Sequence, residues 1–551
     1  MTSNYTEIAN KLNEYFIKVG PNLAEKLPVS NINFETFLSP DKSPSSSFVI
    51  NPTCSDEVFE VINSFSSSSC EGPDKISPKL YKHCAQAISE PLSNMINMCF
   101  ILGHFPKPLK KSRVIPIFKG GNSEESGNWR PISITCCSSK LIEKLVKKRL
   151  LSYLTKHNIL SKYQFGYRNN HSTTHAILNI SNTILRNLDE KTHTVSIFLD
   201  LSKGFDCVDH SILLKKLYHY GIRGVAHDFF KSYLTDRLQA TSVNGVMSDF
   251  LTVLCGVPQG SVLGPLLFLL YTNDLANASN FNINLFADDT CLSLSNKSLF
   301  ELEVQCNREA ARVNDWFIAN KLTTNSKKAS NFLLSHCSRG VVDFKINMGN
   351  VELKRVDSVK YLGIFLDEKV TWSHQIDYLS KRLSSAAGIF SKLRYYLNVK
   401  TMIEMYHSLF NSKLQYAILC WGSASTTKIS KLQVLQNKAI RNMNKAPRYF
   451  RLDNYYLNHR ILKVKDLYDL EIAKFMHGHS QGTLPICFYS FFIESRNLHN
   501  YNTRATANSN YNISNFTTNW GKRSIQCYGP KIWNELPNEI KAYLLNFLSR
   551  K

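Results

Sequence analysis

Apolar residues lead up to two adjacent aspartates within residues 282–294 and resume directly after them. This pattern is typical of a strand, a tight turn and a second strand. The predicted hairpin carries Asp288 and Asp289 at its tip. Both side chains can reach one site only if the chain turns there, because neighbours on a straight strand point to opposite faces. Taken alone, the pair favours a solvated turn, since aspartate is a common turn residue.

A second predicted strand also ends at an aspartate. Residues 194–199 form a short apolar run, and Asp200 follows them. Mg²⁺ takes oxygen ligands from carboxylates and substrate phosphates, which two carboxylate clusters at strand ends are suited to supply. Two ions about 3.5–4 Å apart activate a hydroxyl nucleophile and stabilise a leaving group. Asp206 and Asp209 are weaker candidates because they lie beyond the strand, and Asp209 has the position of a helix N-cap.

A glycine-rich loop, Gly256-Val257-Pro258-Gln259-Gly260, lies between the two clusters and precedes an apolar helical run. Its glycines permit close backbone approach to a ligand. Phe198-Leu199-Asp200 with Phe205-Asp206, then this loop, then Phe286-Ala287-Asp288-Asp289 follow the order of the palm motifs of reverse transcriptases. The chain resembles that family, and especially its non-LTR (LINE-type) retrotransposon members of the jockey and CR1-like branches. Each motif alone has little specificity, but three in this order are specific.

The resemblance implies an α+β fold of the right-hand polymerase type. It comprises fingers, a palm in which an antiparallel sheet packs on helices, and a helical thumb. The expected regions are a helical N-terminal extension over residues 1–105, fingers and palm over 106–368, the thumb over 369–445, and a basic aromatic C-terminal region over 446–551. Family members commonly carry an endonuclease ahead of the polymerase, so the chain is expected to be a polymerase half, either a fragment of an element or a shortened copy.

The resemblance also implies roles for individual residues. Asp200, Asp288 and Asp289 are expected to hold two Mg²⁺ ions, with Mn²⁺ as a substitute. The expected nucleotide-binding residues are Lys119, Arg168, Phe205, Gln259, Gly260 and Lys328, and the expected primer grip is Tyr361, Leu362 and Gly363. An arginine fork suits phosphate oxygens, and a lysine adds a point charge.

Two of these assignments have open alternatives. Phe205 is expected to crowd the ribose 2′-hydroxyl, although an aromatic residue beside a strand is also typical of a core position. Gly204 departs from the alanine usual in the family, which puts the strength of sugar discrimination in doubt. Lys328, with Lys327 as the alternate, is expected to protonate the departing pyrophosphate, although lysines in a loop are often only exposed to solvent.

The chain beyond residue 372 predicts three long helices, over residues 378–397, 401–419 and 429–443. The last helix has a basic side and fits a thumb helix lying along a duplex backbone, as in the family. Residues 446–551 are aromatic and basic. Two of their segments, Gly521-Lys522-Arg523-Ser524 and 528–534, resemble the C-terminal tail of CR1-like elements.

Composition points to a polyanionic partner. The 551 residues contain 66 Lys and Arg against 43 Asp and Glu, a formal net charge of +23. No apolar run approaches the roughly 20 residues of a membrane span, so no membrane partner is expected. The 14 cysteines contain no C-x-x-C pair, which favours a reduced intracellular protein without zinc. His171 and His175 have helical metal-ligand spacing but no third ligand nearby.

These observations together predict an RNA-directed DNA polymerase that transfers nucleotides from dNTPs onto a primer 3′-hydroxyl by two-metal chemistry. An RNA template, a DNA primer or target, and dNTPs are the expected partners, and the nucleus and cytoplasm the expected location, as for a retroelement protein. The alternative is a catalytically inactive RNA- or DNA-binding protein that retains the polymerase fold. Phe205 and Ala287 disfavour an RNA-dependent RNA polymerase, and no G-x-S-x-G, P-loop or H-E-x-x-H motif is present.

Overall fold

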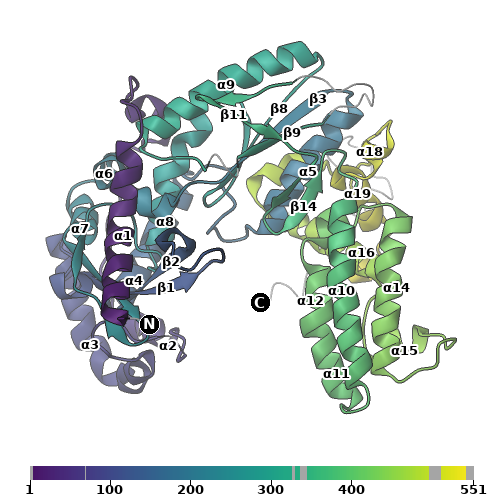
Figure 1. Cartoon of the computed structure of the whole chain (residues 1–551), viewed down its shortest axis with the longest axis horizontal. Coiled ribbons are helices and arrows are strands. Elements are labelled where there is room, and N and C mark those ends of the chain that lie inside the picture. Colours follow the sequence, from purple (N-terminus) through teal and green to yellow (C-terminus); the bar gives the residue numbers. More distant parts are fainter. Residues whose placement is uncertain (1–3, 69, 326–328, 335–343, 496–509, 542–551) are drawn as a thin grey trace. The chain divides into compact units, whose positions relative to one another are not determined.

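The computed structural model of the chain describes residues 4–68, 70–325, 329–334, 344–495 and 510–541 (Figure 1). It divides into two compact units. The first unit comprises residues 1–167, 200–280 and 308–328, and the second comprises residues 168–199, 281–307 and 329–551. The long helix α9 (Leu299–Ala319) contributes residues to both.

The first unit is built on a five-stranded sheet with the order β2-β1-β4-β5, in which β6 also pairs with β4. β1 is antiparallel to β2 and parallel to β4. The strands are β1 (Lys111–Phe118), β2 (Trp129–Thr135), β4 (Arg237–Val243), β5 (Val246–Met247) and β6 (Leu251–Val253). The helices are α1 (Tyr5–Glu25), α2 (Ser55–Asn63), α3 (Pro78–Leu102), α4 (Cys137–Lys156), α6 (His210–His219), α7 (Val225–Leu234) and α8 (Gly264–Thr272).

Helix α1 packs along this sheet, against β4, β5 and β6. The side chain of Asn4 caps its N-terminus by accepting a hydrogen bond from the amide of Thr6 at 3.2 Å. On its buried face, the amide of Asn13 donates to the carbonyls of Gln239 and Asp249 at 3.2 and 2.9 Å. The N-terminal helix is therefore an integral part of the first unit.

The second unit contains a five-stranded sheet with the order β12-β9-β3-β8-β7. β3 is antiparallel to both β8 and β9, and all of its residues are buried. Two separate hairpins, β10–β11 and β13–β14, complete the strands. The strands are β3 (His193–Leu199), β7 (Asn282–Phe286), β8 (Asp289–Asn296), β9 (Ser330–Leu334), β10 (Asn347–Met348), β11 (Val351–Glu352), β12 (Lys354–Arg355), β13 (Ser358–Tyr361) and β14 (Ile364–Asp367).

Helix α5 packs against β3 and β7 of this sheet, and α10 and α14 lie side by side in the helical part of the unit (Figure 1). The helices are α5 (Thr173–Asp189), α10 (Ser373–Leu393), α11 (Val399–Tyr406), α12 (Ser412–Gln415), α13 (Ile418–Trp421), α14 (Thr426–Met443), α15 (Asp453–Asn458), α16 (Val464–Ser480), α18 (Asn519–Lys522) and α19 (Ile525–Glu535). The predicted α+β fold class is confirmed.

The helix predicted over residues 401–419 is broken into α11, a π-helical segment, α12 and α13. The break lies at Tyr416 and Ala417, where Ala417 has a φ of +53°. One local and one tertiary contact hold this geometry. Trp421 donates its indole N–H to the carbonyl of Tyr416, five residues earlier, at 2.9 Å. The hydroxyl of Tyr416 donates to the carbonyl of Leu362. Helical spacing in the sequence carries no sign of either contact.

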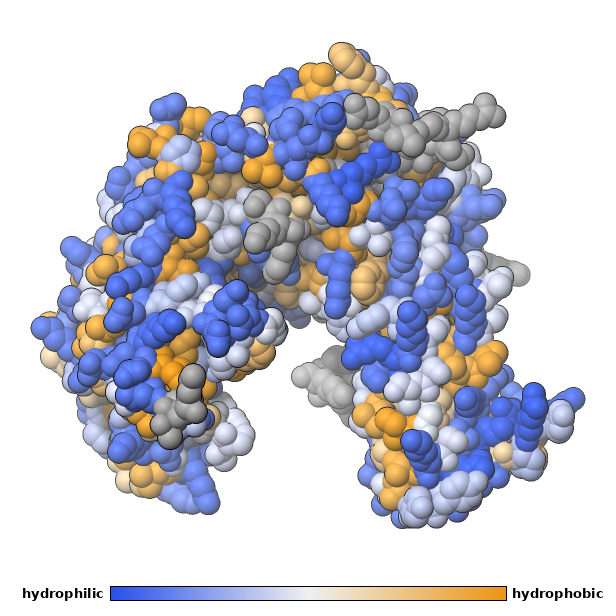
Figure 2. All heavy atoms as spheres, viewed as in Figure 1, coloured by the Kyte–Doolittle hydropathy of each residue, from blue (hydrophilic) through white to orange (hydrophobic). Residues whose placement is uncertain are grey.

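Among the described residues, no helix combines the length and apolar character needed to cross a membrane. Figure 2 shows hydrophilic residues over much of the visible face of each unit, with apolar residues scattered between them.

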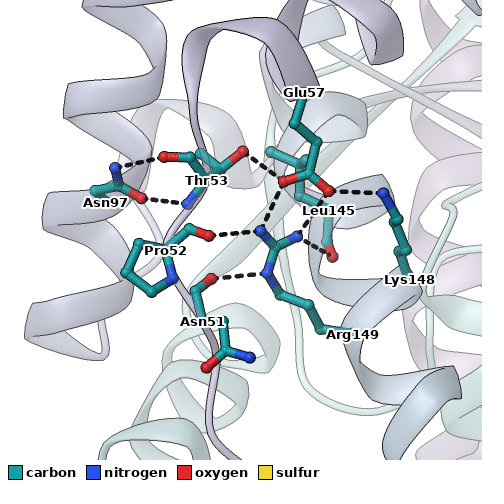
Figure 3. Close-up of polar contacts among 8 residues, drawn as sticks. All are labelled: Asn51, Pro52, Thr53, Glu57, Asn97, Leu145, Lys148 and Arg149. Atoms are coloured by element: carbon teal, nitrogen blue, oxygen red, sulfur yellow. Dashed lines mark hydrogen bonds and ion pairs between the residues drawn. The ribbon is translucent and has the colours of Figure 1, made fainter.

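An ion-pair cluster ties α4 to α2 and to the segment ahead of α2 in the first unit (Figure 3). The guanidinium of Arg149 bonds both carboxylate oxygens of Glu57, and its N–H groups also donate to the carbonyls of Asn51 and Pro52. Burial by itself raises the pKa of Glu57, but hydrogen bonds from Arg149, Lys148 and Thr53 outweigh it and lower the pKa to about 2. The ionised carboxylate is thus stabilised by folding.

Acid is expected to remove the contribution of Glu57 to stability. Because the folded pKa of about 2 lies below the ordinary value of 4.5, this contribution is complete above the ordinary pKa and is lost as the pH falls through the folded one. In urea unfolding at stepped pH, Glu57→Gln is expected to lose less stability than the parent between about pH 5 and pH 2. Glu60→Gln, an exposed change on the same helix, is the control. Equal losses in the parent and Glu57→Gln contradict the prediction.

Candidate active site

The predicted hairpin with two aspartates at its tip is present in the second unit. Phe286 of β7 pairs with Asp289 of β8, which leaves Ala287 and Asp288 as the two turn residues. Ala287 has a φ of +57°, a left-handed conformation that is costly for a residue other than glycine and is often found at functional sites. Asp288 and Asp289 are partly exposed. The turn therefore holds two adjacent carboxylates accessible to solvent.

The neighbouring strand β3 has a register that ends beside this hairpin. Leu199, its last residue, pairs with Thr290, the second residue of β8. Asp200 is the next residue of the chain after Leu199, and its carbonyl accepts a hydrogen bond from the amide of Asn325 at 2.8 Å. Within the described ranges, no group of three or more His, Cys, Asp or Glu side chains is arranged to hold a metal ion, so the two-metal site stays a prediction.

The other two aspartates of this segment have local partners in the first unit. Asp209 is the N-cap of α6, as the sequence predicted, and accepts from the amides of Ser211 and Ile212 at 2.9 and 3.0 Å. Asp206 accepts a hydrogen bond from the side-chain amide of Gln259 at 2.8 Å. Its other carboxylate oxygen is buried without a partner. Burial raises the pKa of Asp206 to about 6, against the opposing effects of Gln259 and nearby cations.

The glycine-rich loop is seated on β2 of the first unit. The carbonyl of Gln259 accepts a hydrogen bond from the amide of Ser133 at 2.7 Å. Gly260 has a φ of +113°, and a Cβ atom there would lie 2.6 Å from the carbonyl oxygen of Ser133. Only glycine fits this position, because a side chain would meet both the unfavourable φ and the backbone of β2.

A buried glutamate that the sequence reasoning missed holds the end of this loop. The carboxylate of Glu143 on α4 accepts hydrogen bonds from the amides of Val262 and Leu263 at 2.7 and 3.0 Å, and from the hydroxyl of Ser139 at 3.0 Å. Its side chain is fully buried. The signal in the sequence was an acid within the apolar side of a basic helix.

The ring of Phe205 is fixed by its neighbours in the first unit. It stacks on Phe268 with ring centroids 4.4 Å apart and an interplanar angle of 13°, and Tyr167 contacts it edge-on at 6.3 Å. A Cβ atom at Gly204 would lie 3.3 Å from atoms of both Leu201 and Phe268. The neighbours of Gly204 therefore pack so closely that an alanine methyl would be tightly confined there. Phe205 itself remains partly exposed.

Three cations gather near Asp206 in the first unit: Lys119, Arg130 and Lys203 each lower its pKa. Lys119 follows β1 and is exposed, and Arg130 is exposed on β2. The ammonium of Lys203 donates to the carbonyls of Gly127 and Trp129 at 3.3 and 3.2 Å. The sequence reasoning named only Lys119, since the hairpin that brings Arg130 alongside it is a tertiary feature.

The remaining predicted site residues lie in the second unit or outside the described residues. Arg168 belongs to the second unit, where burial lowers the pKa of its guanidinium. Lys327 and Lys328 lie outside the described residues. The predicted primer grip is the turn of the β13–β14 hairpin, in which Leu362 and Gly363 have φ angles of +44° and +86°.

Tyr361 anchors this hairpin on the sheet of the second unit. Its buried ring packs against Phe198 of β3 at 5.2 Å, and its hydroxyl accepts a hydrogen bond from Asn284 of β7 at 3.3 Å. The hairpin therefore attaches to the same two strands that lead to Asp200 and to the Asp288–Asp289 turn.

Comparisons with known proteins identify the family of the region that contains these hairpins and the glycine loop. Residues 110–366 match the family described as reverse transcriptase (RNA-dependent DNA polymerase). These residues therefore form a reverse transcriptase domain. The relatives that the chain matches include proteins of non-LTR retrotransposons, which confirms the resemblance seen in the sequence.

Three of these relatives are from Drosophila melanogaster. The chain is 30% identical over 435 residues to the probable RNA-directed DNA polymerase from transposon BS, across 76% of this chain and 47% of the relative. It is 26% identical over 436 residues to the RNA-directed DNA polymerase from mobile element jockey, with the same coverage. It is 29% identical over 427 residues to the probable enzyme from transposon X-element, across 76% and 46%. The chain spans about half the length of these relatives.

Proposed function

We propose that the chain is an RNA-directed DNA polymerase of a non-LTR retrotransposon, which adds nucleotides from dNTPs onto a primer 3′-hydroxyl. The observation that carries this proposal is the turn of the β7–β8 hairpin, which presents Asp288 and Asp289 at the end of the β3–β8 pair within a reverse transcriptase domain. Asp200 follows the same pair on the other strand.

In this proposal Asp200, Asp288 and Asp289 hold two Mg²⁺ ions, for which Mn²⁺ substitutes. Partly exposed carboxylates in a strained turn fit such ions because Mg²⁺ takes hard oxygen ligands and retains water and substrate phosphate in its remaining positions. When bound, the ions supply activation of the primer hydroxyl and stabilisation of the leaving pyrophosphate.

The protein's own residues orient the substrates. Lys119 and Arg168 neutralise the triphosphate. Arg130 and Lys203, which lie near Asp206, contribute to the same role. Gln259 and Gly260 contact the incoming nucleotide and the templating base, and the Asp206 bond fixes the orientation of the Gln259 amide. Lys328 protonates the pyrophosphate, with Lys327 as the alternate. The turn of Tyr361, Leu362 and Gly363 grips the primer end through its backbone.

The proposed partners are an RNA template and a DNA primer or target. The basic side of α14 is proposed to follow a duplex backbone. Lys438 and Arg441 on the helix and Lys445 just beyond its end are the candidates for this role. Of the other two basic residues, Lys428 is bonded to Thr371 and Ser373, and Lys431 lies 3.8 Å from Asp377. The proposed site of action is inside the cell, in the nucleus and cytoplasm, as for a retroelement protein.

Primer extension on an RNA template with Mg²⁺ tests the proposal. Incorporation of dNTPs in strong preference to NTPs is expected. Salt-sensitive RNA binding without any incorporation would instead support the catalytically inactive binding protein, and a preference for NTPs would support an RNA polymerase.

Phe205→Ala is expected to weaken the choice of dNTPs over NTPs by about 10- to 200-fold, the range that one steric group supplies in a pocket. The ring held on Phe268 presents a rigid apolar surface where a 2′-hydroxyl has no room. The measurement is the ratio of kcat/KM for the two substrates. Phe300→Ala, which removes a ring that is 76% exposed, is the control, and an unchanged ratio in Phe205→Ala removes the assignment.

A further inference from the structure

A cavity of about 530 Å³ in the second unit is lined by residues from three parts of the chain. They come from residues 422–433, which lead into and begin α14, from α16, and from the C-terminal segment that resembles the tail of CR1-like elements. Several lining residues carry polar or aromatic side chains, among them Thr426, Lys465, Tyr468, Lys522, Arg523 and Tyr528. The proposed polymerase site includes none of them.

The C-terminal wall of this cavity is fixed to the rest of the second unit. Arg523 donates to the carbonyls of Ser423 and Val370 at 2.8 and 2.6 Å. The carboxylate of Asp189 at the end of α5 accepts from the amide and the hydroxyl of Thr518 at 2.8 and 2.6 Å. A Cβ atom at Gly521 would lie 2.5 Å from Asp189, so the backbone packs closely there. The cavity is therefore preformed.

The charge of the cavity lining is positive. Lys465, Lys522 and Arg523 line the cavity, and no aspartate or glutamate is among its lining residues. Asp469 lies next to the lining and accepts a hydrogen bond from the hydroxyl of Tyr528 at 3.0 Å. Lys465 has its ion-pair partner Asp469 at 2.7 Å, and Lys522 is exposed. The N-terminus of α14 adds to this field, because Ser425 makes no side-chain capping bond to the helix. This combination favours a phosphate group.

The same cavity has an aromatic wall. The rings of Tyr468 and Tyr528 stack with centroids 5.6 Å apart and an interplanar angle of 7°, and the ammonium of Lys465 lies 4.4 Å from the centroid of Tyr528. Tyr528 is partly exposed, whereas Tyr468 is buried behind it. Proteins bind unpaired nucleotides by stacking bases on aromatic rings beside positive charges that track the phosphates.

We propose that this cavity binds one unpaired nucleotide of a single-stranded nucleic acid. Its phosphate lies at Lys522, Arg523 and the start of α14, and its base lies against Tyr528. The volume of about 530 Å³ is within the usual range of small-ligand sites and admits one nucleotide. A base-paired strand cannot enter, because its bases are stacked within the duplex. The site would give the proposed polymerase a single-stranded nucleic acid as a partner, so this inference rests on the proposed function.

The test compares two charge reversals of the same size. Lys522→Glu places a negative charge in the cavity, and Lys531→Glu, an exposed change on α19 outside the cavity, is the matched control. Binding is measured by fluorescence anisotropy with a single-stranded RNA or DNA of about 12 nucleotides and with the same strand in a duplex. Lys522→Glu is expected to weaken single-strand binding about tenfold more than Lys531→Glu, as for loss of one charged phosphate contact. Equal weakening by both variants, or a loss confined to the duplex, overturns the proposal.

A second variant tests the aromatic wall. Tyr528→Leu keeps an apolar side chain and is expected to weaken binding of the single strand about fivefold or more, because stacking of one base contributes about 1–3 kcal/mol. All binding measurements are repeated in the Asp288→Asn background. Binding that persists there without nucleotide incorporation separates this site from catalysis, so failure of the polymerase proposal leaves the result for the cavity intact. An unchanged affinity in Tyr528→Leu contradicts the stacking of a base.

Discussion

Replacement of Asp288 by asparagine is expected to lower dNTP incorporation on the order of a thousandfold or more, because a bound dication supplies several kcal/mol of transition-state stabilisation. Asparagine has nearly the same shape as aspartate and suits a turn equally well, so the hairpin is expected to fold unchanged. What the change removes is the negative charge and one of the hard oxygen ligands of the proposed Mg²⁺ ions.

The measurement is single-turnover primer extension on an RNA template, with template–primer affinity measured in parallel. Affinity is expected to stay within a few-fold of the parent, since the proposed role of Asp288 is to hold metal at the reacting groups and not to bind the length of the duplex. Asp228→Asn is the control, because it makes the same substitution at an exposed position of α7. Incorporation at the parental rate by Asp288→Asn rejects the metal assignment and with it the proposed mechanism.

The second large effect is expected on stability, from a buried ion pair in the first unit. The ammonium of Lys216 on α6 lies 2.6 Å from a carboxylate oxygen of Asp274 and donates to the carbonyl of Tyr271 at 2.6 Å. Their side chains are 0% and 1% exposed. Burial raises the pKa of Asp274 and lowers the pKa of Lys216, and the attraction between the two opposes both shifts.

Lys216→Met is expected to lower the free energy of unfolding by about 3–5 kcal/mol, because the variant leaves the carboxylate of Asp274 buried without its cation. Urea unfolding followed by tryptophan fluorescence measures the change, and Trp316 lies close to the pair, with its ring centroid 5.3 Å from the ammonium. Adding Asp274→Leu to this variant is expected to restore much of the loss, since apolar residues of similar size replace buried ion pairs at little cost.

The neighbouring lysine provides the control. Lys215 forms an ion pair with Glu35 at 3.1 Å, but its side chain is 62% exposed. Lys215→Met is therefore expected to change stability by less than about 1 kcal/mol. If Lys215→Met and Lys216→Met lower the free energy of unfolding by similar amounts, burial of the ion pair does not determine the size of the loss.

The sequence by itself determined the elements that carry the proposed chemistry. The strand, turn and strand around Asp288 and the N-cap at Asp209 were predicted correctly, because the strand period of two and the preferences of turn and cap residues are local. The order of the palm motifs was sufficient to predict the reverse transcriptase family, which the comparisons confirm. The assignment of metal, nucleotide and primer-grip roles to single residues stays a prediction.

Only the tertiary structure decided which distant residues support these elements. Gln259 bonds to Asp206 across 53 positions of sequence, Glu143 holds the end of the glycine loop across 119, and Arg523 reaches Ser423 across 100. The break at Ala417 within a regular helical pattern belongs to the same class. Such contacts depend on where the chain closes its long loops and on which polar groups become buried there, and the spacing of apolar residues along the sequence specifies neither.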